Sequence, residues 1–254
     1  MTRLHFAAIV ALAMGFVAPA CLPAAAAPAD ANAKMMVAAQ RGDAAAVKTL
    51  LSAGAKVDAA DAHGASALMM ASRYVHRPVV KELIKAKANP NLRDANGTTA
   101  LYWAVQRNSA EIVQDLLAAK ANPNLAIADG STPLSEAVEN GSLPIVKALI
   151  RAKANVNSRQ YNGFTPLMTA ASGGMTEVLR VLIAAKADVN AKTKDGSSAL
   201  MLASYSGFLD VVGFLIDAGA DVNVKRADGQ TALKLAISGG NGDVVKYLKA
   251  HGAK

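Results

Sequence analysis

The sequence predicts an all-α solenoid of about seven helix–turn–helix units joined by short hairpin-like turns. Each period holds two short apolar segments of helical length with a turn between them. A fixed period of this size is typical of proteins that stack one supersecondary unit on the next, so that neighbours bury a continuous core. Six glycines lie 33 residues apart and mark the period: Gly64, Gly97, Gly130, Gly163, Gly196 and Gly229.

The repeating unit is clearest around the fourth of these glycines. Residues 162–163, Asn-Gly, predict a tight turn. Thr165 and Pro166 then predict the start of a short helix. The threonine hydroxyl can accept a hydrogen bond from a free backbone N–H, and proline has no N–H that would need a partner at the first helical position. A Gly-Gly turn at 173–174 leads to a second apolar helix over about 177–185. An extended segment follows and leads into the next period.

This unit resembles the ankyrin repeat, and the resemblance covers nearly everything after residue 32. It implies an ankyrin-repeat solenoid that acts as a non-enzymatic protein–protein interaction scaffold. In register, each first helix carries a leucine and then, three residues later, a small alanine, as at Leu167 and Ala170. We expect these leucines to lie between the helices. The expected repeats span residues 33–60, 61–93, 94–126, 127–159, 160–192, 193–225 and 226–254.

The two terminal repeats differ from the others. The first has two helical segments, around 35–40 and 44–51, but no turn before them, as expected of an N-terminal capping repeat. The last repeat places Lys249 where earlier repeats have an apolar residue, which gives it a polar outer face. Residues 28–32 predict a short flexible lead before the first repeat.

The N-terminus has the pattern of a secretory signal peptide over residues 1–27. Arg3 precedes an apolar run at 6–17, and small residues at 24–27 form a cleavage zone. The run of about 12 residues is shorter than the roughly 20 that span a membrane. A membrane anchor and a lipoprotein modified at Cys21 are the alternatives. The signal predicts a periplasmic or secreted protein that has no membrane span after cleavage.

Two departures from the usual ankyrin pattern lead to further predictions. The histidine that usually ties adjacent repeats is absent, so we expect packing to replace that polar network. The glycine that usually ends the second helix in a left-handed conformation is replaced in four repeats. The left-handed conformation costs a residue other than glycine about 1 kcal/mol, and a cation at the helix end offsets roughly 0.3–1 kcal/mol of this. The replacing residues are Lys87, Lys120, Lys153 and Lys186, called here the lysine ladder.

The sequence contains no catalytic constellation and predicts neither a metal site nor a cofactor. No pair among His63, His76 and His251 has the spacing of zinc ligands. Cys21, the only cysteine, leaves with the signal peptide. The net charge of +8 in an exported protein favours acidic proteins or envelope polyanions as partners over nucleic acid. We expect a monomer.

Partner-binding residues are expected at the turn tips and the ends of the first helices, where ankyrin repeats usually contact partners. Exposed aromatic and arginine side chains are the types that anchor interfaces. Phe164 follows the turn glycine, so we expect it to stand on the ridge of turns; Tyr102 and Trp103 are expected to point inward and pack. The candidate binding residues are Arg73, Tyr74, Arg107, Tyr161, Phe164 and Tyr205, with the lysine ladder as a second surface.

The sequence therefore predicts an exported protein-binding scaffold. Two alternatives stay open: a stress-protection accessory that supports an envelope enzyme, and a protein that binds polyanions through the lysine ladder. The dependence of affinity on ionic strength distinguishes polyanion binding from binding through aromatic residues, because contacts made by lysines weaken steeply as salt is added.

Overall fold

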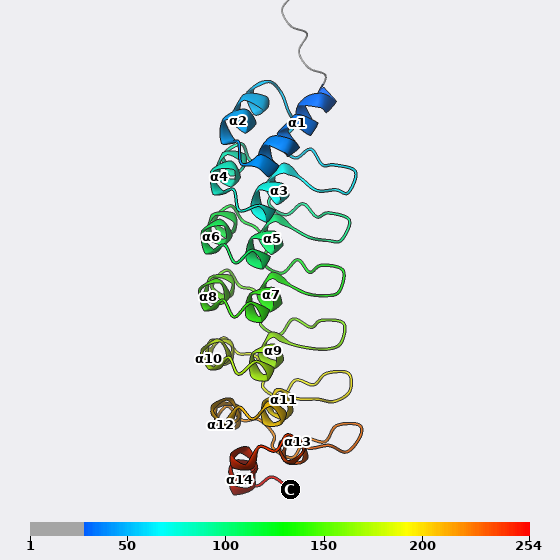
Figure 1. The fold of residues 1–254 in the computed structure, drawn as a ribbon, viewed down its shortest axis with the longest axis vertical. Helices are drawn as coiled ribbons and strands as arrows, with labels where there is room; N and C mark the ends of the chain where they lie inside the picture. Colours follow the sequence, from blue (N-terminus) through cyan, green and yellow to red (C-terminus); the bar gives the residue numbers. More distant parts are fainter. Residues whose placement is uncertain (1–27) are drawn as a thin grey trace, which may run out of the picture.

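A computed structural model describes residues 28–254, and the expected signal peptide at 1–27 lies outside these described residues. The described chain is a stack of helix pairs, as the sequence predicts (Figure 1). The helices are α1 (Pro28–Arg41), α2 (Ala44–Ser52), α3 (Ala67–Arg73), α4 (Arg77–Lys85), α5 (Ala100–Gln106), α6 (Ala110–Ala118), α7 (Pro133–Glu139), α8 (Leu143–Arg151), α9 (Pro166–Ser172), α10 (Thr176–Ala184), α11 (Ala199–Ser206), α12 (Leu209–Asp217), α13 (Ala232–Ser238) and α14 (Gly242–Ala250).

The elements form three columns along the long axis of the molecule (Figure 1). The odd-numbered helices form an inner layer, which lies between the even-numbered outer helices and a row of long turns. Each inner helix packs on the inner helices before and after it, and each outer helix packs on its outer neighbours. The described chain begins at one end of the stack and finishes at the other, and each unit packs on its neighbours.

The inner helices from α3 onward begin at a hydroxyl residue, as predicted. In each case the side-chain oxygen accepts a hydrogen bond from the backbone N–H three residues later, at 3.1–3.3 Å. Such a cap contributes about 1 kcal/mol. The capping residues are Ser66, Thr99, Thr132, Thr165, Ser198 and Thr231.

The core runs without interruption between the two helical layers. The predicted leucines of the inner helices are buried, Leu167 among them, and the alanines three residues later are inaccessible to solvent. The small alanines let the inner and outer helices approach closely, and the larger residues of the outer helices fill the space between units. No helix within residues 28–254 is both long and apolar enough to cross a bilayer.

The flexible lead expected at residues 28–32 is wrong as a separate segment, because these residues form the start of α1. Proline is well suited to the first helical position, and the alanine-rich sequence that follows it favours a helix. Ala31 is buried, and Asn32 Oδ1 accepts a hydrogen bond from the Lys56 backbone N–H at 2.9 Å. The helix is therefore anchored to the first unit from its first turn onward.

A polar network does tie the units together, contrary to the expectation that packing alone replaces the missing histidines. Its members are asparagines, one in each of the turns that leave α4, α6, α8, α10 and α12. Each side-chain N–H₂ donates to a backbone carbonyl 29 residues later at 3.0–3.3 Å. Each side-chain oxygen accepts from a backbone N–H 31 residues later at 2.7–3.0 Å. The asparagine ladder consists of Asn91, Asn124, Asn157, Asn190 and Asn223.

Backbone hydrogen bonds also join the tips of neighbouring turns. The Tyr161 N–H donates to the Asp129 carbonyl at 3.1 Å, and equivalent bonds occur along the row. Glycine is required where the turns approach this closely: Gly163 has φ of +86°, and a Cβ there would lie 3.0 Å from the Lys194 backbone nitrogen. The 33-residue glycine period thus marks the points of contact between turns.

Candidate partner-binding surface

Four side chains gather where the inner helices α3 and α5 end. The guanidinium carbon of Arg73 lies 4.5 Å from the centre of the Trp103 ring and 5.8 Å from that of Tyr74. A cation over an aromatic face at this distance is attracted by the ring, by about 0.5–1 kcal/mol at exposed sites. Arg107 completes the group, because its Nε donates to the Arg73 carbonyl at 3.0 Å. These four residues are called the Arg73 cluster.

The cluster presents cationic groups that lack acidic partners in the described part of the chain. Neither Arg73 nor Arg107 lies within ion-pair distance of a carboxylate there. The Nε of Arg73 is buried and makes no hydrogen bond. Tyr74 is 41% exposed, and its hydroxyl accepts a hydrogen bond from Gln40 Nε2 at 3.4 Å. The group therefore offers a fixed guanidinium and an exposed phenol on one surface.

Trp103 is the member that sequence reasoning assigned to packing. It is half-buried, and it contacts both the core and the Arg73 guanidinium. The equivalent residues one period away on either side, Met70 and Glu136, are also half-buried on the inner helices. The stacking itself depends on two residues 30 positions apart, and no motif in the sequence links them.

The next unit along the inner face is acidic. The Tyr102 hydroxyl donates to Glu136 Oε2 at 2.7 Å, and burial together with this carboxylate raises the pKa of Tyr102 far above its ordinary value. Gln160 Nε2 donates to Glu139 Oε1 at 2.9 Å. Tyr102 is buried, as predicted. The inner face thus changes from basic in the second and third units to acidic in the fourth.

The three candidate aromatic residues of the fifth and sixth units lie in different surroundings. Tyr161 is 68% exposed on its turn, as expected. Phe164 is half-buried against the core, so its expected position on the ridge is wrong. The Phe164 carbonyl accepts a bond from Gln160 N–H at 3.0 Å, which closes the turn and leaves the phenyl ring against the stack. Tyr205 is 58% exposed but lies seven residues beyond the cap Ser198, about 10 Å along α11.

The lysine ladder has the left-handed backbone that the sequence predicts. The four residues have φ of 65–70°, and all four are exposed. The carbonyls of Lys120, Lys153 and Lys186 accept hydrogen bonds from the asparagine ladder of the preceding unit. The backbone at this position therefore links neighbouring units. Its side chain points to solvent, so the residue type there can vary.

Residues 28–254 hold no group of three or more histidine, aspartate or glutamate side chains that could bind a metal ion. A family model for ankyrin repeats, built of three copies, matches residues 35–127, 111–193, 134–226 and 170–254. The chain belongs to the ankyrin repeat family. No curated protein matches it. Ankyrin repeats generally serve as protein–protein interaction modules, and proteins built of them are typically non-enzymatic scaffolds.

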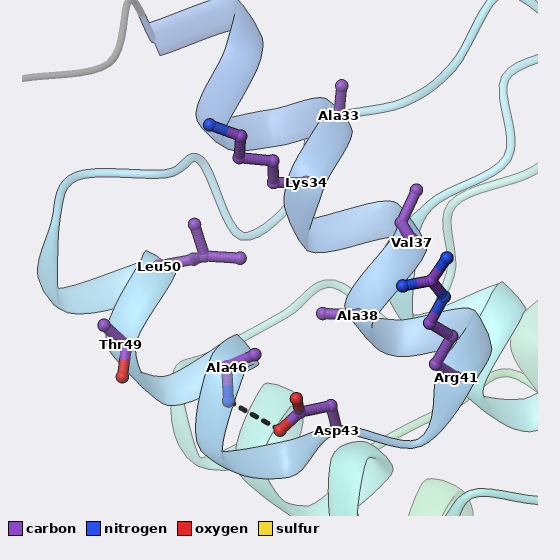
Figure 2. A pocket seen from close by; sticks show the side chains of 9 residues that line it. All are labelled: Ala33, Lys34, Val37, Ala38, Arg41, Asp43, Ala46, Thr49 and Leu50. Atoms are coloured by element: carbon purple, nitrogen blue, oxygen red, sulfur yellow. Dashed lines mark hydrogen bonds between the residues drawn. The ribbon is translucent and has the colours of Figure 1, made fainter.

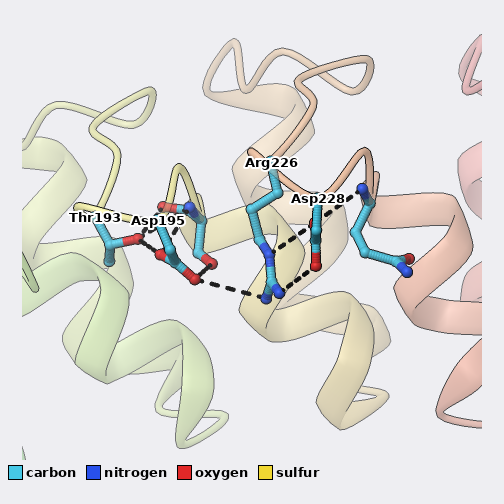
Figure 3. A network of polar contacts seen from close by, with 6 residues as sticks. Thr193, Asp195, Arg226 and Asp228 are labelled. Carbon is cyan, nitrogen blue, oxygen red and sulfur yellow. Dashed lines mark hydrogen bonds and ion pairs between the residues drawn. The ribbon is translucent and has the colours of Figure 1, made fainter.

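The last two turns of this ankyrin stack hold a separate polar network (Figure 3). The Asp195 carboxylate accepts from the Thr193 hydroxyl and from Ser197 Oγ, the latter at 2.9 Å, and lies 3.6 Å from an Arg226 nitrogen. Arg226 also donates from Nε to Asp228 at 3.2 Å. Hydrogen bonds from Thr193 and from Arg226 hold the pKa values of Asp195 and Asp228, respectively, below their ordinary range. These groups satisfy one another, so this ankyrin network ties turns together and leaves no unpaired charge for a partner.

Proposed function

We propose that this ankyrin chain is a non-enzymatic scaffold that binds a protein partner through the Arg73 cluster. The observation that carries the proposal is the Arg73 guanidinium, held over Trp103 beside Arg107 with no carboxylate partner in the described part of the chain. Arginine and aromatic side chains dominate the energy of protein interfaces. Guanidinium groups bind carboxylates through paired hydrogen bonds, so an acidic segment of the partner fits this surface.

A double variant tests this assignment. Arg73→Ala with Arg107→Ala should leave folding nearly unchanged and weaken capture of the partner at least about tenfold, or about 1.4 kcal/mol. The matched control is Arg180→Ala, because Arg180 also lies over an aromatic ring, 4.0 Å from Phe214, but between outer helices. The partner is captured by cross-linking in native extracts and its affinity is then measured calorimetrically. Equal loss in the control, or none in the double variant, would contradict the assignment.

The proposal includes export to the cell envelope or the medium. Its support is the sequence of the first 27 residues, where Arg3 leads an apolar run that ends in small residues. N-terminal sequencing of protein from its native source should begin between about residues 25 and 30. An intact Met1 on the folded protein would contradict export. Support of an envelope enzyme under stress is one specific form of this scaffold role, and the identity of the captured partner tests it.

A second candidate function, polyanion binding, is favoured by the exposure of the lysine ladder. Its four side chains are exposed and form no ion pair with the described carboxylates. An anionic polysaccharide is a suitable probe, because binding through exposed lysines is screened as the Debye length falls from about 10 Å at 0.1 M salt to 3 Å at 1 M. Replacing all four lysines by asparagine, which tolerates the left-handed backbone, should remove the salt-dependent part of the affinity. Affinity that is unchanged would exclude this surface.

A further inference from the structure

The N-terminal end of the stack has an open groove between α1 and α2. Leu50 on α2 and Ala38 on α1 point toward one another between the helices (Figure 2). The groove has a volume of about 600 Å³ and combines an apolar floor with charged side chains on its rim. Its lining includes Val37, Ala38 and Leu50, with Lys34, Arg41 and Asp43 at the rim.

This groove is the surface through which later units pack on their predecessors. Leu83, one period after Leu50, is inaccessible to solvent because the first unit covers it. Leucine recurs at this position in every later unit and is equally buried there, up to Leu248 in the last unit. Leu50 has no preceding unit within the described residues and is only partly buried. The first unit thus keeps an apolar half-interface.

The outer faces of the two terminal units differ in their residues. At the C-terminal end, Lys249 replaces the Ile84 of an internal unit, and this gives the polar face that a terminal repeat needs. At the N-terminal end Leu50 remains, and Val37 on α1, which lines the same groove, is 44% exposed. The groove thus keeps its apolar floor, whereas the outer face of the opposite end combines Lys249 with one exposed apolar residue, Ile237, which is 57% exposed.

The rim of the groove is basic on α1. Lys34 and Arg41 are seven residues apart, which is two helical turns or about 10 Å, and both are exposed. Lys34 occupies a position that is a buried alanine at Ala67, one period later. Among the described residues its only ion pair is with Asp30 on the same helix, where both side chains are more than half exposed, and such pairs contribute little. Asp43 is occupied in capping α2, where it accepts the Ala46 N–H at 2.8 Å.

We propose that this groove binds an amphipathic helix of a partner protein. The apolar stripe of that helix packs between α1 and α2 against Leu50 and Val37. Carboxylates two turns apart on its flank pair with Lys34 and Arg41. This surface is separate from the Arg73 cluster, and the proposal does not depend on the function proposed for that cluster.

Charge disfavours the other occupants. A second copy packed antiparallel on α1 would place Lys34 opposite Arg41. A copy stacked head to tail would set the charged Lys249 against α2, because the equivalent Ile84 lies beside Ala118 and Ala119 of the next outer helix. Residues 1–27 contain no aspartate or glutamate, so this segment of the chain supplies no counter-charge. Like charges that face one another across an interface suppress that pairing.

Two synthetic helices serve as probes for the full-length chain. Each is a fluorescently labelled amphipathic peptide of roughly 18 residues with a leucine stripe, long enough to form a helix. One carries glutamates two turns apart beside the stripe, and the other carries lysines at the same positions. Anisotropy titration should show the glutamate peptide binding about tenfold more tightly than the lysine peptide.

Variants of the protein then locate the binding site. Lys34→Glu with Arg41→Glu changes two exposed residues and should reverse the preference between the two peptides. Leu50→Lys should abolish binding, whereas Leu209→Lys, at an exposed leucine of α12, should leave it unchanged. The variant that lacks Arg73 and Arg107 should bind as the wild type does. Equal affinity for both peptides, or a preference that survives the charge reversal, would overturn the proposal.

Discussion

The helix stack and the row of turns share one 33-residue period, yet they constrain their residues very differently. The leucine positions of the inner helices keep their residue in every unit from Leu68 to Leu233. The residue two positions before each turn glycine is instead Ala62, Ala95, Ala128, Tyr161, Lys194 or Ala227. A side chain in the stack is buried against two neighbours, whereas the residue two positions before the turn glycine lies at an exposed tip and contributes its backbone hydrogen bond. Stability thus resides in the stack, while variation is tolerated in the turns.

The largest effect should come from removing a side chain of the stack. Leu167→Ala deletes a buried side chain between helices and should destabilise the protein by about 2–5 kcal/mol through lost burial and a cavity. Since each unit contacts only its neighbours, we expect urea unfolding to become less cooperative. A loss below about 0.5 kcal/mol would show that Leu167 lies outside the core.

Two aromatic residues of one turn should behave oppositely. Phe164→Ala removes a ring that packs on the core and should cost about 1–3 kcal/mol, whereas Tyr161→Ala at the exposed tip should change stability by less than about 0.5 kcal/mol. Thermal and urea unfolding of both variants measure the difference. Equal stability would place both rings on the surface.

An asparagine of the ladder should contribute more to the free energy of unfolding than an asparagine at a turn tip. Asn157→Ala removes the bonds to the Lys186 carbonyl and the Asp188 N–H, and we expect a loss of about 1–2 kcal/mol. Asn96 lies at an exposed turn tip, so Asn96→Ala should cost less than about 0.5 kcal/mol. If the two variants lose equal amounts of unfolding free energy, the hydrogen bonds of the ladder do not stabilise the stack appreciably.

Replacing a lysine of the lysine ladder by glycine should increase the stability of the fold. Lys120 has φ of 68°, so Lys120→Gly should relieve strain and stabilise the fold by up to about 1 kcal/mol. The control is Lys147→Gly inside α8, where glycine should destabilise by about 0.5–1 kcal/mol. The same substitution therefore changes sign with backbone conformation, and denaturant midpoints report that sign.

The smallest effect should be the acid sensitivity of the last turns. Asp195 and Asp228 have pKa values lowered in the folded state, so their stabilising contribution is present above the ordinary aspartate pKa of about 3.9. It is lost as the pH falls through the lower folded values. Asp228→Asn should therefore lose less stability than the wild type when urea unfolding is compared at about pH 7 and pH 3. Because both carboxylates are about half exposed, the difference should be small.

Much of the stack could be predicted from the sequence because its determinants recur locally. A buried leucine, a capping hydroxyl or a left-handed lysine is set by its own unit and appears at the same place in several units. The start of α1 was missed because no turn precedes it to mark a boundary. The asparagine ladder was visible as a 33-residue period from Asn91 to Asn223, but its hydrogen bonds join different units.

The candidate binding surface was harder to predict than the fold. Arg73, Tyr74 and Arg107 were identified from their positions at helix ends, and they do lie together. Trp103 was assigned to packing because it was expected to point inward on its helix, and that direction alone does not show which neighbour a ring contacts. Phe164 was misplaced because the direction of a side chain after a turn depends on how that turn closes against the helices.

The asparagine ladder also determines how the length of this protein can change. Asn157 reaches a carbonyl 29 residues later and an N–H 31 residues later. If residues 160–192 were excised, Asn157 would face the Gly219 carbonyl and the Asp221 N–H, which are the present partners of Asn190. Asn157 could then form the same two hydrogen bonds with its new partners. Gain or loss of genetic material in steps of one whole unit therefore keeps the asparagine ladder in register, whereas loss of part of a unit that includes these partners would leave one asparagine without them.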